Sequence, residues 1–198
     1  MTEELKFKVV FVGDSTVGKT SIIHKYLKLD GEIPSTVGAT STRVDTIVNE
    51  EQLHLSVWDT AGQETFRNLV PVYAKGANAA VIVFDQSNKQ TYEHVSGWYS
   101  YLQQHVGDII IIVVQNKCDL NCDIDQAEVF QWAEEHHVQV ISTSAKDGTG
   151  VSSLFEILSK SLYDTVFNHD EDVVISEQPP AVDIEADKKP SHEKKGCC

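Results

Sequence analysis

Segments with strand-like and helix-like hydrophobic patterns alternate along most of the chain. Residues 6–12 and 53–57 have the pattern of strands, and residues 79–84 and 109–114 are apolar runs typical of central parallel strands covered on both faces. Apolar residues recur at helical spacing over residues 18–28, 88–105, 125–136 and 150–163, and residues 138–141 resemble one more short strand. Strands separated by helices predict a doubly wound α/β sheet, whose ligand binds at the carboxyl ends of the strands.

The last part of the sequence differs from the rest in composition. The chain has 198 residues, 16 Lys and Arg against 30 Asp and Glu, and a net charge of −14. Residues 164–198 contain nine of the acids, four lysines and three of the five prolines, with few large apolar side chains. Such a segment buries too little surface to offset its ordering entropy. We therefore predict one domain over residues 1–163 and a disordered tail over 164–198; the alternative, a terminal helix, is disfavoured by Pro179 and Pro180.

Charge and composition argue against several classes of protein. The acidic balance repels phosphate polymers, so a non-specific nucleic-acid binder is not expected. No apolar run approaches the ~18 residues of a membrane helix, and the N-terminal sequence MTEELKFKVV has acids where a signal peptide has bases. Two of the four cysteines are the last two residues, which does not suggest a disulfide framework. We expect a soluble protein of a reducing compartment.

A phosphate-binding loop follows the first predicted strand. The sequence GDSTVGKTS at residues 13–21 fits the pattern G-x-x-x-x-G-K-[ST]. The glycines let successive N–H groups point at phosphate oxygens, Lys19 supplies a positive charge near the β- and γ-phosphates, and Thr20 offers a hydroxyl to Mg²⁺. The residues expected to contact a nucleotide here are Asp14, Ser15, Thr16, Val17, Gly18, Lys19, Thr20 and Ser21.

Two later segments indicate which base is bound. The strands over residues 109–114 and 138–141 run into QNKCD (115–119) and STSAK (142–146). The Asp119 carboxylate is able to accept hydrogen bonds from both N1–H and the 2-amino group of guanine, and adenine offers no such pair of donors. Asn116 and Lys117 are expected to brace the loop, and the Ala145 amide to meet the guanine oxygen; Ser144 and Lys146 complete the expected base site.

With WDTAGQE at residues 58–64, the chain resembles a known family. GDSTVGKT, WDTAGQE, NKCD and TSAK resemble, in order and approximate spacing, the motifs of Ras-like small GTPases, and within them the Rab branch, over residues 6–163. The resemblance implies the P-loop NTPase (Ras-like) fold, with a six-stranded, mostly parallel sheet flanked by helices on both faces. It also implies a switch that hydrolyses GTP to GDP, binds Mg²⁺ and recruits effectors to membranes in vesicle traffic.

The same resemblance assigns roles around the γ-phosphate. Asp59 is expected to hold Mg²⁺ together with Thr20 and Thr36, which precedes Asp59 by 23 residues and is followed by a small apolar residue and glycine as in the family. Thr40 and Thr42 compete for the role of Thr36 but lack that following pair. The Gly62 N–H would sense the γ-phosphate, and Gln63 would orient the attacking water. The catalytic candidates are Gln63, Lys19 and Thr36.

Partners are also implied by the resemblance. The only two arginines, Arg43 and Arg67, are not obvious built-in arginine fingers, so we expect slow hydrolysis that a GTPase-activating protein accelerates by supplying an arginine. An exchange factor, a GDP-dissociation inhibitor, a prenylation escort and effectors of the GTP form are the other expected partners of a monomer. Cys197 and Cys198 are similar to the doubly prenylated ending of many Rabs, which implies a lipid anchor at the cytoplasmic face of an intracellular membrane and cycling with the cytosol.

The chain also departs from the Rab pattern. The stretch from Lys19 to Thr36 is shorter than is usual for Rabs and lacks the aromatic that covers the nucleotide, which predicts a looser lid and faster exchange. Of the aromatic triad that Rabs use for effectors, Trp58 and Tyr73 match, whereas Ser41 occupies the phenylalanine position. The expected effector surface comprises Val37, Gly38, Trp58 and Tyr73; Trp58 as a plain sheet-edge packing residue is the alternative.

Two other functions stay open on sequence grounds. Another Ras-like branch, of the Rho or Ran type, is disfavoured by the two terminal cysteines. A nucleotide-locked scaffold that binds partners without cycling is disfavoured by the intact Thr20, Thr36, Asp59 and Gln63.

Overall fold

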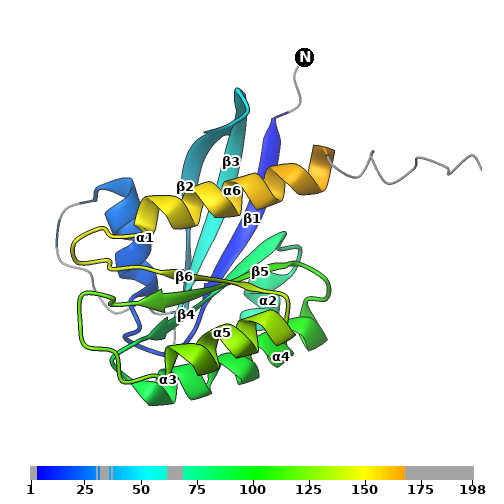
Figure 1. Cartoon of the computed structure of the whole chain (residues 1–198). Helices are drawn as coiled ribbons and strands as arrows, with labels where there is room; N and C mark the ends of the chain where they lie inside the picture. Colours follow the sequence, from blue (N-terminus) through cyan, green and yellow to red (C-terminus); the bar gives the residue numbers. More distant parts are fainter. Residues whose placement is uncertain (1–3, 30, 32–35, 37, 62–68, 168–198) are drawn as a thin grey trace, which may run out of the picture.

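The protein folds around one six-stranded sheet in the order β2-β3-β1-β4-β5-β6 (Figure 1). The structure, a computed structural model, describes residues 4–29, 31, 36, 38–61 and 69–167. All neighbouring strands pair in parallel except β2, which is antiparallel to β3. The strands are β1 (Leu5–Val12), β2 (Ala39–Val48), β3 (Glu51–Thr60), β4 (Ala79–Asp85), β5 (Ile110–Asn116) and β6 (Gln139–Ser142).

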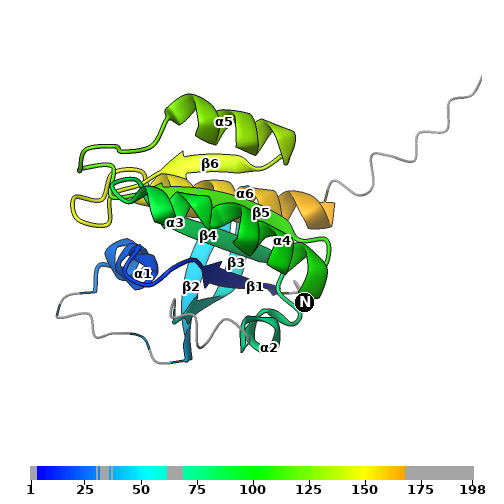
Figure 2. The same cartoon turned by 90° about the horizontal axis from the view of Figure 1, so that it is seen from below.

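Helices cover both faces of the sheet (Figures 1 and 2). Helices α1 and α6 pack with one core cluster, whereas α2, α3, α4 and α5 pack with the cluster on the opposite face. The helices are α1 (Lys19–Leu27), α2 (Val70–Ala74), α3 (Lys89–Glu93), α4 (Val95–His105), α5 (Gln126–Glu135) and α6 (Val151–Phe167). None of the helices in the described part of the chain is both long and apolar enough to span a bilayer.

The central strands are buried on both faces, which explains their continuous apolar sequences. In β1, Val9 and Phe11 belong to the core under α1 and α6, and Val10 and Val12 to the core on the other face. Every residue of β4 is buried. The prediction of a mostly parallel six-stranded sheet with helices on both faces is confirmed.

Two predicted boundaries were wrong. The helix expected over residues 88–105 is divided into α3 and α4 at His94, whose own N–H reaches the Gln90 carbonyl at a stretched 3.3 Å. The last helix continues to Phe167, so residues 164–167 belong to α6 rather than to the tail. The Phe167 ring stacks on Tyr163 with 4.3 Å between centroids, and this contact helps to extend the helix.

Strand β2 could not be delimited by apolar pattern because most of its residues are exposed or half-buried and only Val44 is fully buried. Its place at the edge of the sheet is set by ten consecutive pairs with β3, from Ala39 opposite Thr60 to Val48 opposite Glu51. This hairpin places Ala39, three residues after Thr36, opposite Thr60 at the carboxyl end of β3, beside the predicted site.

Candidate functional site

The predicted phosphate loop lies between β1 and α1, at the carboxyl edge of the sheet. Gly13 and Gly18 have positive φ angles of 136° and 100°. A Cβ atom at Gly13 would lie 2.2 Å from the Val83 carbonyl oxygen of β4, and one at Gly18 would lie 2.3 Å from the Asn116 amide nitrogen of β5. Both glycines are therefore required twice, by backbone conformation and by close packing against neighbouring strand ends.

Lys19 is folded back into this loop. Its Nζ donates to the carbonyl oxygens of Gly13 (2.8 Å) and Asp14 (2.7 Å), and the residue is 5% exposed. Burial lowers the pKa of Lys19 to about 8, although the Asp59 and Asp14 carboxylates oppose the shift. The amine is thus held at the centre of the loop by carbonyl groups, in a place where an anionic phosphate would stabilise its charged form.

Three side chains from distant parts of the sequence meet beside Lys19. Asp59 Oδ2 accepts hydrogen bonds from the hydroxyls of Thr20 (2.6 Å) and Thr36 (3.0 Å), which lie 2.9 Å from each other. Thr40 is the cross-strand partner of Asp59 in the sheet register, but it is exposed. The structure therefore places Thr36, and not Thr40, with Thr20 and Asp59.

The chemistry of these three side chains fits a hard divalent cation. Asp59 is buried, and its second oxygen, Oδ1, has no hydrogen-bond partner among the described residues. A buried carboxylate oxygen without a partner is costly. One carboxylate and two hydroxyls are the kind of oxygen donors with which Mg²⁺ and its bound waters interact.

Asn116, at the end of β5, ties the loops of the site together and does not face outward. It is 1% exposed, and its Nδ2 donates to the Val17 carbonyl of the phosphate loop at 2.7 Å. Its Oδ1 accepts from the Thr143 hydroxyl (3.0 Å) and from the Ala145 N–H (3.3 Å) of the loop after β6. This geometry agrees with the expected bracing role and adds Thr143, which sequence reasoning missed.

Asp119 is the acidic group of the expected base site. Its Oδ1 accepts from the Ser144 hydroxyl at 2.7 Å, and its Oδ2 lies 3.5 Å from the Lys146 amine. The hydrogen bond from Ser144 is the main reason why the pKa of Asp119 lies below its ordinary value, and Lys146 adds to the effect. The carboxylate is therefore ionised at neutral pH and acts only as an acceptor.

Lys117 is braced by a residue that sequence reasoning missed. Its Nζ lies 2.6 Å from Asp85 Oδ2, at the end of β4. Burial raises the pKa of Asp85, but hydrogen bonds from Lys117 and Ser87 outweigh it and leave the pKa lowered. The signal was available, because Asp85 comes directly after the apolar run of residues 79–84 and ends β4, whose carboxyl end neighbours that of β5.

A cavity of about 530 Å³ joins these segments. Residues of the phosphate loop, the end of β5 and the loop after β6 line it: Thr16, Gly18, Ser21, Asn116, Lys117, Asp119, Leu120, Ala145 and Lys146. Leu120 was not predicted. Ser15 is exposed beside this lining, whereas the Asp14 carboxylate is bound to His94 and Trp98 of the neighbouring helices.

The residues expected to bind effectors lie beside the β2–β3 hairpin. The Trp58 ring stacks with Tyr73 at 6.2 Å between centroids, and the Lys8 amine lies 4.6 Å above the Trp58 ring. Ser41 is the cross-strand partner of Trp58, so the position where Rabs were expected to carry a third ring is filled by a small polar residue. Gly38 lies close to Tyr73, since a Cβ added there would be 3.6 Å from the Tyr73 hydroxyl.

Several predicted residues lie outside the described residues. They are Val37, Gly62, Gln63, Arg67, Cys197 and Cys198.

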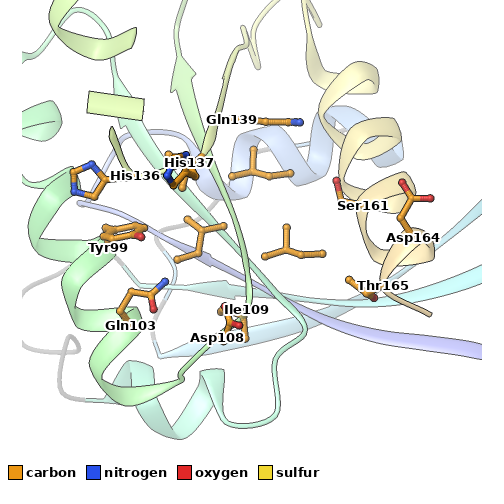
Figure 3. A pocket seen from close by; sticks show the side chains of 14 residues that line it. Tyr99, Gln103, Asp108, Ile109, His136, His137, Gln139, Ser161, Asp164 and Thr165 are labelled. Atoms are coloured by element: carbon orange, nitrogen blue, oxygen red, sulfur yellow. The ribbon is translucent and has the colours of Figure 1, made fainter. Parts of the chain in front are cut away.

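A larger cavity, of about 700 Å³, lies at the other end of the sheet (Figure 3). It is lined by residues of α4, the start of β5, the segment leading into β6, and α6, among them Tyr99, Ile110, His136 and Asp164. It shares no residue with the cavity around Asp119. Because ligands of doubly wound sheets bind at the carboxyl ends of the strands, we assign the smaller cavity, and not this one, to the nucleotide.

The sheet order, the phosphate loop and the two loops around Asp119 define a P-loop nucleotide-binding protein of the Ras-like type. Comparison with known families agrees: the model of the Ras family matches residues 8–164, so the chain belongs to the Ras family.

Relatives of known name place it among the Rab proteins. The chain is 33% identical to human Ras-related protein Rab-22A over 202 aligned positions, which cover 98% of each chain, and 32% identical to the mouse protein over the same coverage. It is also 33% identical to Ras-related protein Rab11A of Lotus japonicus over 165 positions, 81% of this chain and 73% of the relative. The protein is a Rab-type small GTPase that binds GTP and GDP.

Proposed function

We propose that this Rab-type GTPase is a membrane-anchored switch that alternates between GDP and GTP forms, hydrolyses GTP slowly by itself and recruits effectors only when GTP is bound. The observation that carries the proposal is the meeting of Thr36 with Thr20 and Asp59. Thr36 lies between α1 and β2 in the sequence, and we infer that a group bound at Asp59 and Thr20 also holds Thr36. The contact with Thr36 is then able to report whether a γ-phosphate is present.

Each site residue has a role that follows from its chemistry. Lys19 and the loop N–H groups bind the phosphates, and Thr20, Thr36 and Asp59 hold Mg²⁺, which neutralises charge on the β- and γ-phosphates when bound. Asp119 selects guanine, while Asn116, Lys117 and Thr143 hold the loops in place. Gln63 orients the attacking water, and the Gly62 N–H senses the γ-phosphate.

The experiment that tests the switch follows the bound nucleotide. Purified protein loaded with GTP should contain mainly GDP after hours of incubation, as measured by chromatography of the released nucleotide. Effectors captured with a non-hydrolysable GTP analogue should not be captured with GDP. Bound GTP that persists unchanged, with equal partner capture in both forms, would instead establish a nucleotide-locked scaffold.

The low pKa of Lys19 predicts that nucleotide binding takes up protons. At pH 8 about half of the Lys19 amines are neutral in the nucleotide-free protein, and bound phosphate restores the charge. Binding should therefore take up about half a proton at pH 8, less at pH 7, and affinity should fall by up to about tenfold per pH unit above pH 8. Calorimetry of GDP binding in two buffers of different ionisation enthalpy measures this uptake; an uptake of zero at pH 8 contradicts the lowered pKa of Lys19.

The lid prediction concerns nucleotide release. Leu29 is 51% exposed and residues 29–34 include no aromatic, so GDP should leave faster than from human Rab-22A measured in parallel. An aromatic introduced by Leu29→Phe should slow release of a fluorescent GDP analogue. Ile47→Phe, at an exposed position far along β2, is the matched control and should leave the rate unchanged. Release no faster than from Rab-22A is the contrary result.

The membrane anchor rests on the two terminal cysteines. One lipid chain binds membranes only marginally, whereas two anchor a protein stably. In cells, the intact chain should sediment with membranes, the Cys197→Ser/Cys198→Ser double variant should be soluble, and each single variant should divide between the fractions. Equal membrane association of the double variant would rule out the lipid anchor.

A further inference from the structure

The Asp14 side chain connects the phosphate loop to the helices on one face of the sheet. Its Oδ2 lies 2.6 Å from His94 Nδ1, and its Oδ1 accepts from Trp98 Nε1 at 3.1 Å. His94 stands at the junction of α3 and α4, and Trp98 is in the first turn of α4. These partners are 80 and 84 positions away from Asp14 in the sequence, so the pattern around the phosphate loop does not predict these contacts.

The main chain of the same residue holds Lys19. The Asp14 carbonyl accepts from Lys19 Nζ at 2.7 Å. A shift of Asp14 therefore moves one of the two carbonyl groups that position the amine expected to bind the phosphates.

The phosphate loop between Asp14 and Lys19 contains a strained residue. Thr16 has a φ of 64°, a left-handed conformation that a β-branched residue rarely adopts. One residue further on, the Val17 carbonyl is held by Asn116 Nδ2 at 2.7 Å. The strained residue is thus restrained on both sides, by the Asp14 contacts on one and by Asn116 on the other, and such strain persists only where the surroundings enforce it.

We propose that His94 and Trp98 are positioning residues for nucleotide retention. By holding the Asp14 carboxylate they keep the strained phosphate loop, and with it Lys19, in the conformation that binds phosphate. The inference rests on the proposed nucleotide-binding role of this loop and adds to it a control point on α4, outside the nucleotide motifs. A force that displaces the start of α4 then weakens the hold on the nucleotide.

The two contacts differ in expected strength. The His94 side chain is 46% exposed and that of Asp14 24%, so loss of this pair should have only a small effect. Trp98 is 4% exposed, and removal of its N–H leaves a partly buried carboxylate oxygen with one donor fewer. We expect GDP release to become about two- to fivefold faster in His94→Ala, and about five- to tenfold faster in Trp98→Phe, which keeps most of the ring packing.

Release of a fluorescent GDP analogue from the full chain, in excess unlabelled GDP and Mg²⁺, tests these values. Matched controls are Trp132→Phe on α5 and His105→Ala at the far end of α4, both of which should leave the rate unchanged. His94→Asn, whose amide is able to donate to the carboxylate, should restore the wild-type rate within about twofold. The thermal midpoint of each GDP-bound variant shows whether it is folded.

Two combinations distinguish positioning from a general loss of stability. In an Asp14→Ala background, His94→Ala and Trp98→Phe should have no further effect, because the group that they hold is gone. In a Thr16→Gly background, their effects should shrink, because glycine adopts a φ of 64° without strain.

The proposal is overturned if the folded His94 and Trp98 variants release GDP at the wild-type rate, or if their effects persist undiminished in the Asp14→Ala background. A different result, failure of the intact protein itself to bind GDP, would overturn the proposed function instead.

Discussion

Replacement of Asp119 by asparagine should weaken GTP binding on the order of 10⁴-fold, because a site built to hydrogen-bond one base rejects a mismatched one by about this factor. The carboxylate accepts from Ser144 and, in the proposed complex, from the two donors of guanine. An asparagine in its place presents an N–H group to one of the two guanine donors, so that this guanine donor and the asparagine N–H are both left without an acceptor. Equilibrium binding to nucleotide-free protein, measured by calorimetry, gives the loss directly.

The same variant should gain affinity for xanthosine triphosphate. Xanthine has a carbonyl oxygen where guanine has its 2-amino group, so the asparagine N–H meets an acceptor. Asp123→Asn is the matched control, since Asp123 lies in the same loop after β5 as Asp119 but is exposed and does not line the cavity around Asp119. Undiminished GTP binding by Asp119→Asn, or ATP that competes equally with GTP for the wild-type protein, would show that residue 119 does not choose the base.

Much of this site was predictable because parallel strands bring their carboxyl ends to one edge. The motifs at the ends of β1, β3, β5 and β6 had to meet there, and their described residues do so. Asp85 obeys the same rule at the end of β4 and was missed because no motif marked it. The rule fixes which segments meet but not how side chains pair. Asn116 was expected to brace its loop, yet nothing in the sequence shows that it does so through Val17 and Thr143.

The direction of the Asp14 side chain could not be predicted for the same reason. The phosphate-loop pattern treats this position as variable, and the partners of its carboxylate come from helices more than 70 positions away. The spacing of apolar residues also did not predict where helices end. The acidic composition after residue 163 indicated the tail, but ring stacking between Tyr163 and Phe167 continues α6 into it. Composition sets an average tendency, whereas side-chain pairs four residues apart support individual helical turns.

A GTPase-activating protein that supplies an arginine should accelerate hydrolysis by about 10³–10⁵-fold. The purified chain alone should turn over bound GTP on the order of 10⁻⁴ per second, as expected for an enzyme without a built-in arginine finger. Of its two arginines, Arg43 is already engaged on β2: its Nε lies 2.8 Å from Asp45 Oδ1, and its Nη2 lies 2.7 Å from His54 Nδ1. In the sheet register Arg43 lies opposite Ser56 and not opposite Asp59, so it is not placed beside the expected γ-phosphate site.

Single-turnover hydrolysis of radiolabelled GTP, with and without the activating domain of a Rab GTPase-activating protein, measures this acceleration. It should vanish when the activating domain's arginine is replaced by alanine, and it should also vanish in Gln63→Leu, which cannot orient the attacking water. Arg43→Ala should leave the unassisted hydrolysis rate within about twofold of the wild-type rate, since the Arg43 guanidinium contacts Asp45 and His54. A tenfold loss of that rate in Arg67→Ala would mean that the chain carries its own arginine finger after all. The rate of GTP hydrolysis would then be set mainly by this protein itself. An arginine finger of its own acts in every turnover and leaves a partner little charge stabilisation to add.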